Sequence, residues 1–246
     1  MVRMHAAAPT YALYLESGPK RRKTMVHVPE LLGCVAVGAT TDEAVAATPA
    51  AVRAYLAFLQ RHGEMVDPAA PFDTRIAEHV TEGEWLGNGS PYLAFAFDLE
   101  PVPPEEIDVL LRRFRWLRED LAAWAAAQDD AALDAAPVPA GRPARAVLLH
   151  MMGGPGNYLS APLGGLKGFS ATVSAAERGE VGLAEGLLRI AAMACDAVHA
   201  ATPAQRSAVI ERPGRVITLR KALRRTLEHD WEHFAELVRR PGGPEG

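Results

Sequence analysis

This chain of 246 residues has few cysteines, a small net charge and no long apolar runs. The two cysteines, Cys34 and Cys195, lie far apart and form no CxxC pair, which argues against a disulfide framework and favours a reducing compartment. No apolar run reaches the ~20 residues that a membrane-spanning helix needs. The first ten residues also lack the apolar core of a signal peptide. We therefore expect a cytoplasmic protein without a membrane partner.

The formal net charge is only −4, so the chain gives no global reason to expect nucleic acid or an acidic surface as partner. A hydrophobic fraction of 49% and a charged fraction of 23% are ordinary for a globular protein. The length suits one large domain or two smaller ones. These values favour a globular protein.

The first 100 residues combine short β-type runs with one helical segment. Runs rich in Val, Tyr and Thr between residues 9 and 40 are divided by turn residues and predict three strands. Thr41, as a capping hydroxyl before two acids, predicts a helix over residues 41–62. Further strands are expected near Thr74–Val80 and Tyr92–Asp98. The pattern is that of a β-β-β-α-β unit.

Within this unit, a Pro-x-x-x-Gly-Cys turn precedes a Gly-x-Thr and an acidic helix start. The residues are Pro29, Gly33, Cys34, Gly38, Thr40, Asp42, Glu43 and Ala44. Over about residues 9–100 the chain resembles the HicB-like antitoxin family, and this resemblance implies a small α/β fold. Antitoxins of that family bind a small toxin and carry a DNA-binding tail. Nothing after residue 100 looks like that tail, so only the fold is expected to carry over.

Three prolines in the short stretch 101–104 mark a boundary, because they stiffen the chain just before an acidic helix start. We expect a first domain over residues 1–100, a Pro-rich linker over 101–104 and a second domain over 105–246.

Beyond the linker the sequence predicts helices and no strands. Apolar residues recur at helical spacing in four segments. These are residues 105–127, a segment that begins at Ala144–Met152, residues 174–200 and Arg220–Arg240. Four such segments favour a four-helix bundle. The predicted fold class is therefore α+β, with two domains.

The last of these helices carries His229 and His233 four residues apart, which places two imidazoles one turn apart on a single face. His150, on the second predicted helix, is a third candidate ligand, since bundles build metal sites from side chains on facing helices. Three imidazoles suit zinc or nickel best, with iron, cobalt and manganese as further options. The alternative is that these are ordinary histidines on an amphipathic helix, and their spacing alone does not decide.

Three runs carry a second resemblance. They are RRFRWLREDLAAWAAAQDDAALDAAP, PARAVLLHMMGGPGNYL and RKALRRTLEHDWEHFAELV. Over about residues 103–242 the chain resembles the DinB/YfiT-like family of metalloenzymes. In that family one histidine on the second helix and two on the last helix bind a divalent metal, which implies His150, His229 and His233 here. Members of the family include transferases, isomerases and hydrolases that act with low-molecular-weight thiols.

One departure from the family pattern follows His150 closely, at Gly153-Gly154-Pro155-Gly156. Proline inside a helix costs about 3 kcal/mol and glycine adds to that cost. We therefore expect the helix to end or kink just past His150.

The leading hypothesis from the sequence is an enzyme in which a three-histidine metal activates water or a low-molecular-weight thiol for hydrolase or transferase chemistry. Asp230 is expected near the apolar stripe of its helix, where it would orient a histidine ligand. Bundles of this kind often form homodimers. The alternative is a binding or regulatory protein, in which the HicB-like domain holds a partner, the bundle dimerises and no catalysis occurs.

Overall fold

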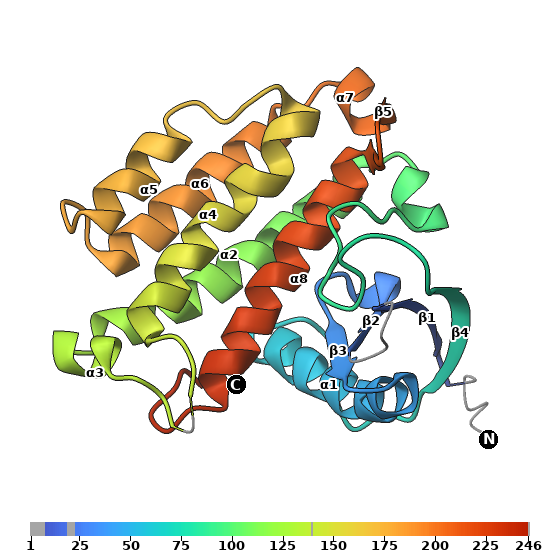
Figure 1. Cartoon of the computed structure of the whole chain (residues 1–246), viewed down its shortest axis with the longest axis horizontal. Coiled ribbons are helices and arrows are strands. Elements are labelled where there is room, and N and C mark those ends of the chain that lie inside the picture. The colour runs from blue at the N-terminus through green and yellow to red at the C-terminus, as the bar shows by residue number, and fades with distance from the viewer. Residues whose placement is uncertain (1–7, 19–22, 139, 246) are drawn as a thin grey trace, which may run out of the picture. The chain divides into compact units, whose positions relative to one another are not determined.

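The computed structural model describes residues 8–18, 23–138 and 140–245 (Figure 1). The chain divides into two compact units, Met1–Phe95 and Ala96–Gly246. The fold is α+β, with a small mixed sheet of four strands in the first unit and mostly helices in the second. None of the helices in the described ranges has both the length and the apolar composition that crossing a membrane requires.

The first unit contains the predicted β-β-β-α-β order. Its elements are β1 (Thr10–Ser17), β2 (Thr24–His27), the 3-10 helix η1 (Pro29–Leu31), β3 (Val35–Gly38), α1 (Thr41–Arg61) and β4 (Asp73–Val80). The sheet order is β3-β2-β1-β4. Strands β1, β2 and β3 pair antiparallel, whereas β4 pairs parallel to β1 after the crossover through α1.

Helix α1 begins where the sequence predicts, with a different capping residue. The side chain of Thr40, rather than Thr41, accepts a hydrogen bond from the backbone N–H of Glu43 at 3.2 Å. The carboxylate of Glu43 in turn accepts from the backbone N–H of Ala39 at 2.9 Å. These reciprocal bonds satisfy backbone donors that the first turn leaves open, and so fix the start of the helix.

The strand predicted at Tyr92–Asp98 is wrong. This segment is a loop that leads into the 3-10 helix η2 (Ala96–Leu99). The hydroxyl of Ser90 accepts from the backbone N–H groups of Tyr92 and Leu93, at 3.2 and 3.3 Å. These local bonds hold the start of the segment in a turn and offer its backbone an alternative to a strand ladder.

The second unit is built on four long helices. They are α2 (Pro104–Ala126), α4 (Ala144–Leu163), α6 (Leu183–His199) and α8 (Leu219–Val238), accompanied by the shorter α3 (Asp130–Asp134), α5 (Phe169–Glu177) and α7 (Pro203–Ser207). Helices α2 and α4 each pack against both α6 and α8. Their facing sides form the core, which includes Phe114, Leu121, Val147, Ile190, Leu223 and Phe234.

Two predictions for this unit need correction. The helix expected over residues 174–200 is instead α5 and α6, separated by a turn in which Gly179 has a φ of +73° that most other residues avoid. The unit also contains a short antiparallel hairpin, β5 (Ile210–Arg212) and β6 (Arg215–Ile217). Its turn is Pro213-Gly214, with Gly214 at φ +75°. The prediction missed the hairpin because each strand has only three residues.

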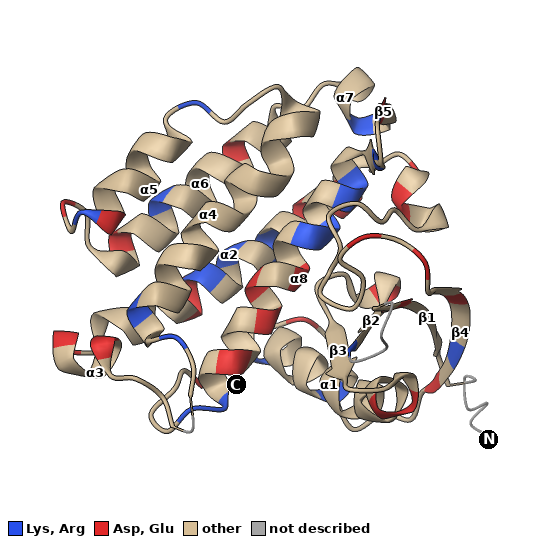
Figure 2. Ribbon diagram, in the orientation of Figure 1, with Lys and Arg blue, Asp and Glu red and all other residues tan. Residues whose placement is uncertain are grey.

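Helix α8 confirms the prediction for Arg220–Arg240 and has an unusual charge order. Lys and Arg occupy its first half and Asp and Glu its second (Figure 2). This order opposes the helix macrodipole, which favours acids near the N-terminus and cations near the C-terminus. Tertiary contacts of its buried charged side chains must therefore offset the unfavourable placement.

Candidate metal centre

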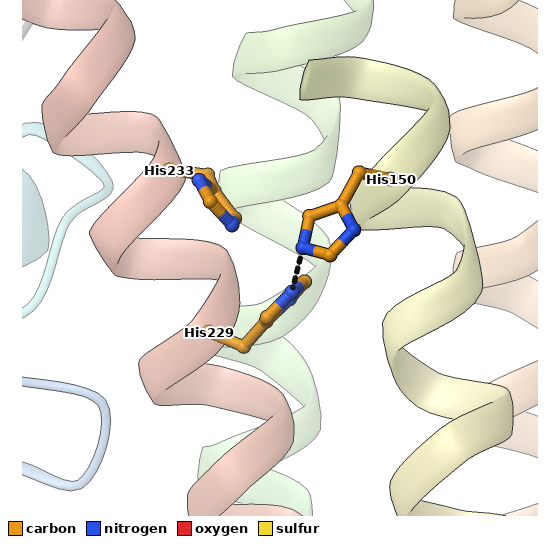
Figure 3. Close-up of side chains that lie close together, drawn as sticks. All are labelled: His150, His229 and His233. Carbon is orange, nitrogen blue, oxygen red and sulfur yellow. Dashed lines mark hydrogen bonds between the residues drawn. The ribbon is translucent and has the colours of Figure 1, made fainter. Parts of the chain in front are cut away.

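His150, His229 and His233 meet between α4 and α8 (Figure 3). One ligand atom of each ring lies within 4.8 Å of the others. The ring centroids are 4.8 to 4.9 Å apart in all three pairs. The shortest approach joins the two Nε2 atoms of His150 and His229, at 2.9 Å. The structure thus brings together the three residues that the sequence singles out.

Helix α4 runs without interruption past His150 to Leu163, so the predicted end of this helix is wrong. The glycines at this point allow close packing. A Cβ atom on Gly154 would lie 2.9 Å from Nδ1 of His229, and one on Gly156 would lie 2.5 Å from the ring of Phe169. Glycine at position 154 therefore leaves the room that the His229 ring occupies beside α4.

Asp230 follows His229 on α8 and is fully buried, as the sequence predicts. Its carboxylate accepts two hydrogen bonds from Arg118 on α2, Nε to Oδ2 at 2.5 Å and Nη2 to Oδ1 at 2.9 Å. Oδ1 also lies 3.5 Å from Nδ1 of His229. Burial raises the pKa of Asp230, but the charge of Arg118 and the bonds to Arg118 and His229 outweigh it and hold the pKa below its ordinary value.

His233 has its own acidic partner, which the sequence reasoning missed. Nδ1 of His233 lies 3.0 Å from Oε2 of Glu236, and Glu236 also pairs with Arg240. Glu236 follows His233 by three residues on α8, and Arg240 follows Glu236 by four, just beyond the end of the helix. A carboxylate three residues after a ligand histidine was the signal available in the sequence.

The pKa of each imidazole lies below its ordinary value. Burial is the largest cause for all three, and the neighbouring histidine lowers each pKa further, against the opposing effect of nearby acids. The three rings are consequently neutral near pH 7. Neutral imidazole is the form that coordinates a metal ion.

This donor set fits a divalent transition metal. Three imidazole nitrogens converge, while carboxylates lie at the Nδ1 atoms of His229 and His233, an arrangement that fixes the tautomer in which Nε2 is free to coordinate. The group has three members, and His150 is exposed. A structural zinc site is usually closed by four protein ligands, whereas a catalytic one keeps a position open. The geometry therefore suits an open site.

Both cysteines are buried, neither forms a disulfide within the described residues, and neither belongs to the histidine group. Tyr158 on α4 is a further residue that the sequence reasoning did not identify. Its ring centroid lies 5.9 Å from that of His229, and the guanidinium carbon of Arg225 lies 5.6 Å from the same Tyr158 centroid. Its position two turns after His150 was the only hint in the sequence.

No protein-family model matches this chain, and no match was found among the curated proteins or the solved structures.

Proposed function

We propose that this protein is a divalent-metal-dependent enzyme whose second unit is a DinB-like four-helix bundle. The observation that carries the proposal is the convergence of His150, His229 and His233, with ligand atoms within 4.8 Å of one another. Zinc and nickel suit this set best, and iron, cobalt and manganese are further options.

The proposed chemistry requires an accessible ion with an open coordination position. A divalent ion in such a site lowers the pKa of a water or thiol that reaches the open position. The residues of the chain hold the ring orientations: Asp230 lies beside His229, and Glu236 beside His233. Neutral rings supply the lone pairs, and the exposed position of His150 gives a substrate access from solvent.

The proposed reaction class is hydrolase or transferase, with a low-molecular-weight thiol as one substrate. This part rests on the resemblance of residues 103–242 to the DinB/YfiT-like family. The first unit is proposed to be HicB-like in fold, with no antitoxin activity.

Metal analysis of the purified full-length protein tests the proposal. We expect about one divalent ion per chain in the wild type, and loss of that ion in His150→Ala, His229→Ala and His233→Ala. His199→Ala is the matched control, because His199 lies on α6 and pairs with Asp108 at an exposed position. Absence of bound metal in the wild type would refute the proposal.

Catalysis is tested separately, by the consumption of a thiol in the presence of electrophilic substrates. The wild-type protein should lose turnover on chelation and regain it when zinc or nickel is returned. A protein that binds stoichiometric metal and shows no metal-dependent turnover with water or thiol nucleophiles would instead favour the binding or regulatory alternative.

A further inference from the structure

Arg118 contacts the residue that directly follows a metal ligand on each of the two ligand-bearing helices. On α8 it donates to both carboxylate oxygens of Asp230, which follows His229. On α4 its Nη2 donates to the backbone oxygen of Met151, which follows His150, at 2.7 Å. One side chain from α2 therefore ties together the two helices that carry the ligands.

The backbone oxygen of Met151 is free to accept this bond because of Pro155. In an α-helix the N–H of residue 155 would bond to the oxygen of residue 151, four residues earlier. Proline has no N–H, so the proline in the Gly-Gly-Pro-Gly stretch opens one acceptor on α4. Arg118 donates to that oxygen from α2, and a backbone group that would otherwise lack a partner is satisfied.

The surroundings of Arg118 fix its position. Its side chain is completely buried, and its guanidinium carbon lies 5.2 Å from the centroid of the Phe114 ring. Among the described residues its Nη1 has no hydrogen-bond partner, so Asp230 and Met151 alone direct the guanidinium. The planar fork is required, since a lysine ammonium cannot bond both carboxylate oxygens in parallel and also reach a third acceptor.

We propose that Arg118 is a positioning residue for the metal centre: by binding Asp230 and the Met151 carbonyl at once, it sets the spacing of His150 and His229. This inference rests on the proposed metal-binding function and extends it to a third helix. Arg118 acts through the two ligand helices and does not itself bind the ion.

The test compares Arg118→Lys with the wild-type, full-length protein. The zinc dissociation constant is measured by competition with a chelator, and the visible absorption spectrum of the cobalt-loaded protein reports ligand geometry. We expect zinc binding to weaken about 10- to 100-fold, the usual cost of losing a group that orients metal ligands. The cobalt bands should also change in position or intensity.

Arg224→Lys is the matched control. Arg224 is as deeply buried as Arg118 and is bonded to Asp98 in η2 and Glu228 on α8, so its replacement perturbs a comparable ion pair whose partners do not lie on α4. It should lower the melting temperature about as much as Arg118→Lys, yet keep zinc affinity within about twofold and the cobalt spectrum unchanged. Equal loss of affinity in both variants would show a general effect of stability and overturn the proposal.

Pro155→Ala carries the test should Arg118→Lys fail to fold. Alanine restores the N–H that competes for the Met151 oxygen, and it removes a helix-breaking residue. We expect a melting temperature at or above that of the wild type together with weaker zinc binding. Wild-type affinity in Pro155→Ala, or in a folded Arg118→Lys, refutes the positioning role alone. A wild-type protein that binds no zinc or cobalt refutes the metal centre itself.

Discussion

Two polar clusters include side chains of α8 and differ in how their hydrogen-bonding groups are satisfied. The ion-pair cluster consists of Asp98, Arg224, Arg225 and Glu228; the histidine cluster consists of His150, His229 and His233. In the first, Arg224 donates to both oxygens of Asp98 at 2.8 Å and to Glu228 at 3.0 Å, and Arg225 donates to Glu228 at 2.7 Å. Two cations meet two anions, so this cluster is neutral.

The histidine cluster, in contrast, does not consist of paired opposite charges. Its two α8 rings have acidic neighbours at Nδ1, while the ring edges that face one another carry lone pairs and few protons. A neutral imidazole has one donor and one acceptor nitrogen. Three of them converging on a point bring together more lone pairs than N–H groups, and a cation would accept the unused lone pairs. The ion-pair cluster balances its own charges, whereas the histidine cluster has the donor set of a metal site.

Asp98→Ala should destabilise the ion-pair cluster and leave the histidine cluster intact. Removing one partner leaves Arg224 charged and buried, which costs about 3–5 kcal/mol of folding free energy. Metal affinity should stay within about threefold, because Asp98 bonds Arg224, which lies five residues before His229 on α8. Denaturant unfolding and zinc titration of the same preparation measure the two effects.

Asp108→Ala is the control for that variant, since Asp108 pairs with His199 at an exposed position. It should change the free energy of unfolding by no more than about 0.5 kcal/mol. If zinc affinity fell in Asp98→Ala as much as in the alanine variants of His150, His229 and His233, the two clusters would act as one functional unit.

Lys221, at the ion-pair end of α8, gives a dependence on pH. Burial lowers its pKa from 10.5 to about 8, and Arg224, Arg215 and Arg225 lower it against the attraction of Asp98. Its Nζ donates to the backbone oxygen of Val216 at 2.7 Å. Below pH 8 Lys221 is protonated in both the folded and the unfolded chain, so burying its charge lowers the stability of the fold by the full amount.

Between pH 8 and 10.5 the unfolded chain binds more protons than the folded one, and stability from this group rises with pH. The difference in unfolding free energy between wild type and Lys221→Met should therefore move in favour of the wild type by about 2–3 kcal/mol across this window. Urea unfolding at pH 7.5, 9 and 10.5 measures it. A difference that stays constant across these pH values would contradict the shifted pKa.

Gly154→Ala should perturb the histidine cluster directly. Its Cβ would lie 2.9 Å from Nδ1 of His229, so the ring or the helix must move, at a cost of about 1–2 kcal/mol. Zinc affinity should fall about tenfold, because His229 is displaced. Gly153→Ala is the neighbouring control: its Cβ would meet nothing within 4 Å, and it should stabilise α4 by up to about 1 kcal/mol with unchanged affinity.

Glu236→Gln is expected to have the smallest effect. The amide keeps the shape of the carboxylate beside His233 but loses its charge, and the site is only half-buried. Zinc binding should weaken about tenfold or less, the lower end for groups that orient ligands, with little change in the melting temperature. A loss as large as that of His233→Ala would mean that Glu236 itself binds the ion.

The sequence predicts elements well where local signals agree. Helix α8 has an unbroken apolar stripe, and α1 has a hydroxyl cap followed by acids, so both begin and end within a residue or two of expectation. Tyr92–Asp98 has strand-like composition, yet Ser90 bends its start, and Asp98 is bound by Arg224, 126 positions away in the chain. Distant partners of this kind leave no local trace.

The candidate site also contains some residues that the sequence identifies and others whose roles depend on distant contacts. His229 and His233 are visible as an i,i+4 pair, and His150 is a third candidate on another predicted helix, which the family resemblance supports. Arg118 lies in the run RRFRWLRED, where it looks like one of several surface cations; only the packing of α2 shows that it is buried against Asp230. Pro155 reads as a helix breaker, because the donor that replaces its missing N–H at the Met151 carbonyl belongs to Arg118 on another helix.

X-ray absorption spectroscopy of the zinc-loaded, full-length protein is the decisive measurement for the three-histidine site, because it counts the ligands around the ion. We expect three imidazole ligands with the rest of the coordination sphere made of oxygen donors, and one fewer imidazole in His229→Ala. Sulfur ligation, or fewer than three imidazoles in the wild type, would contradict it.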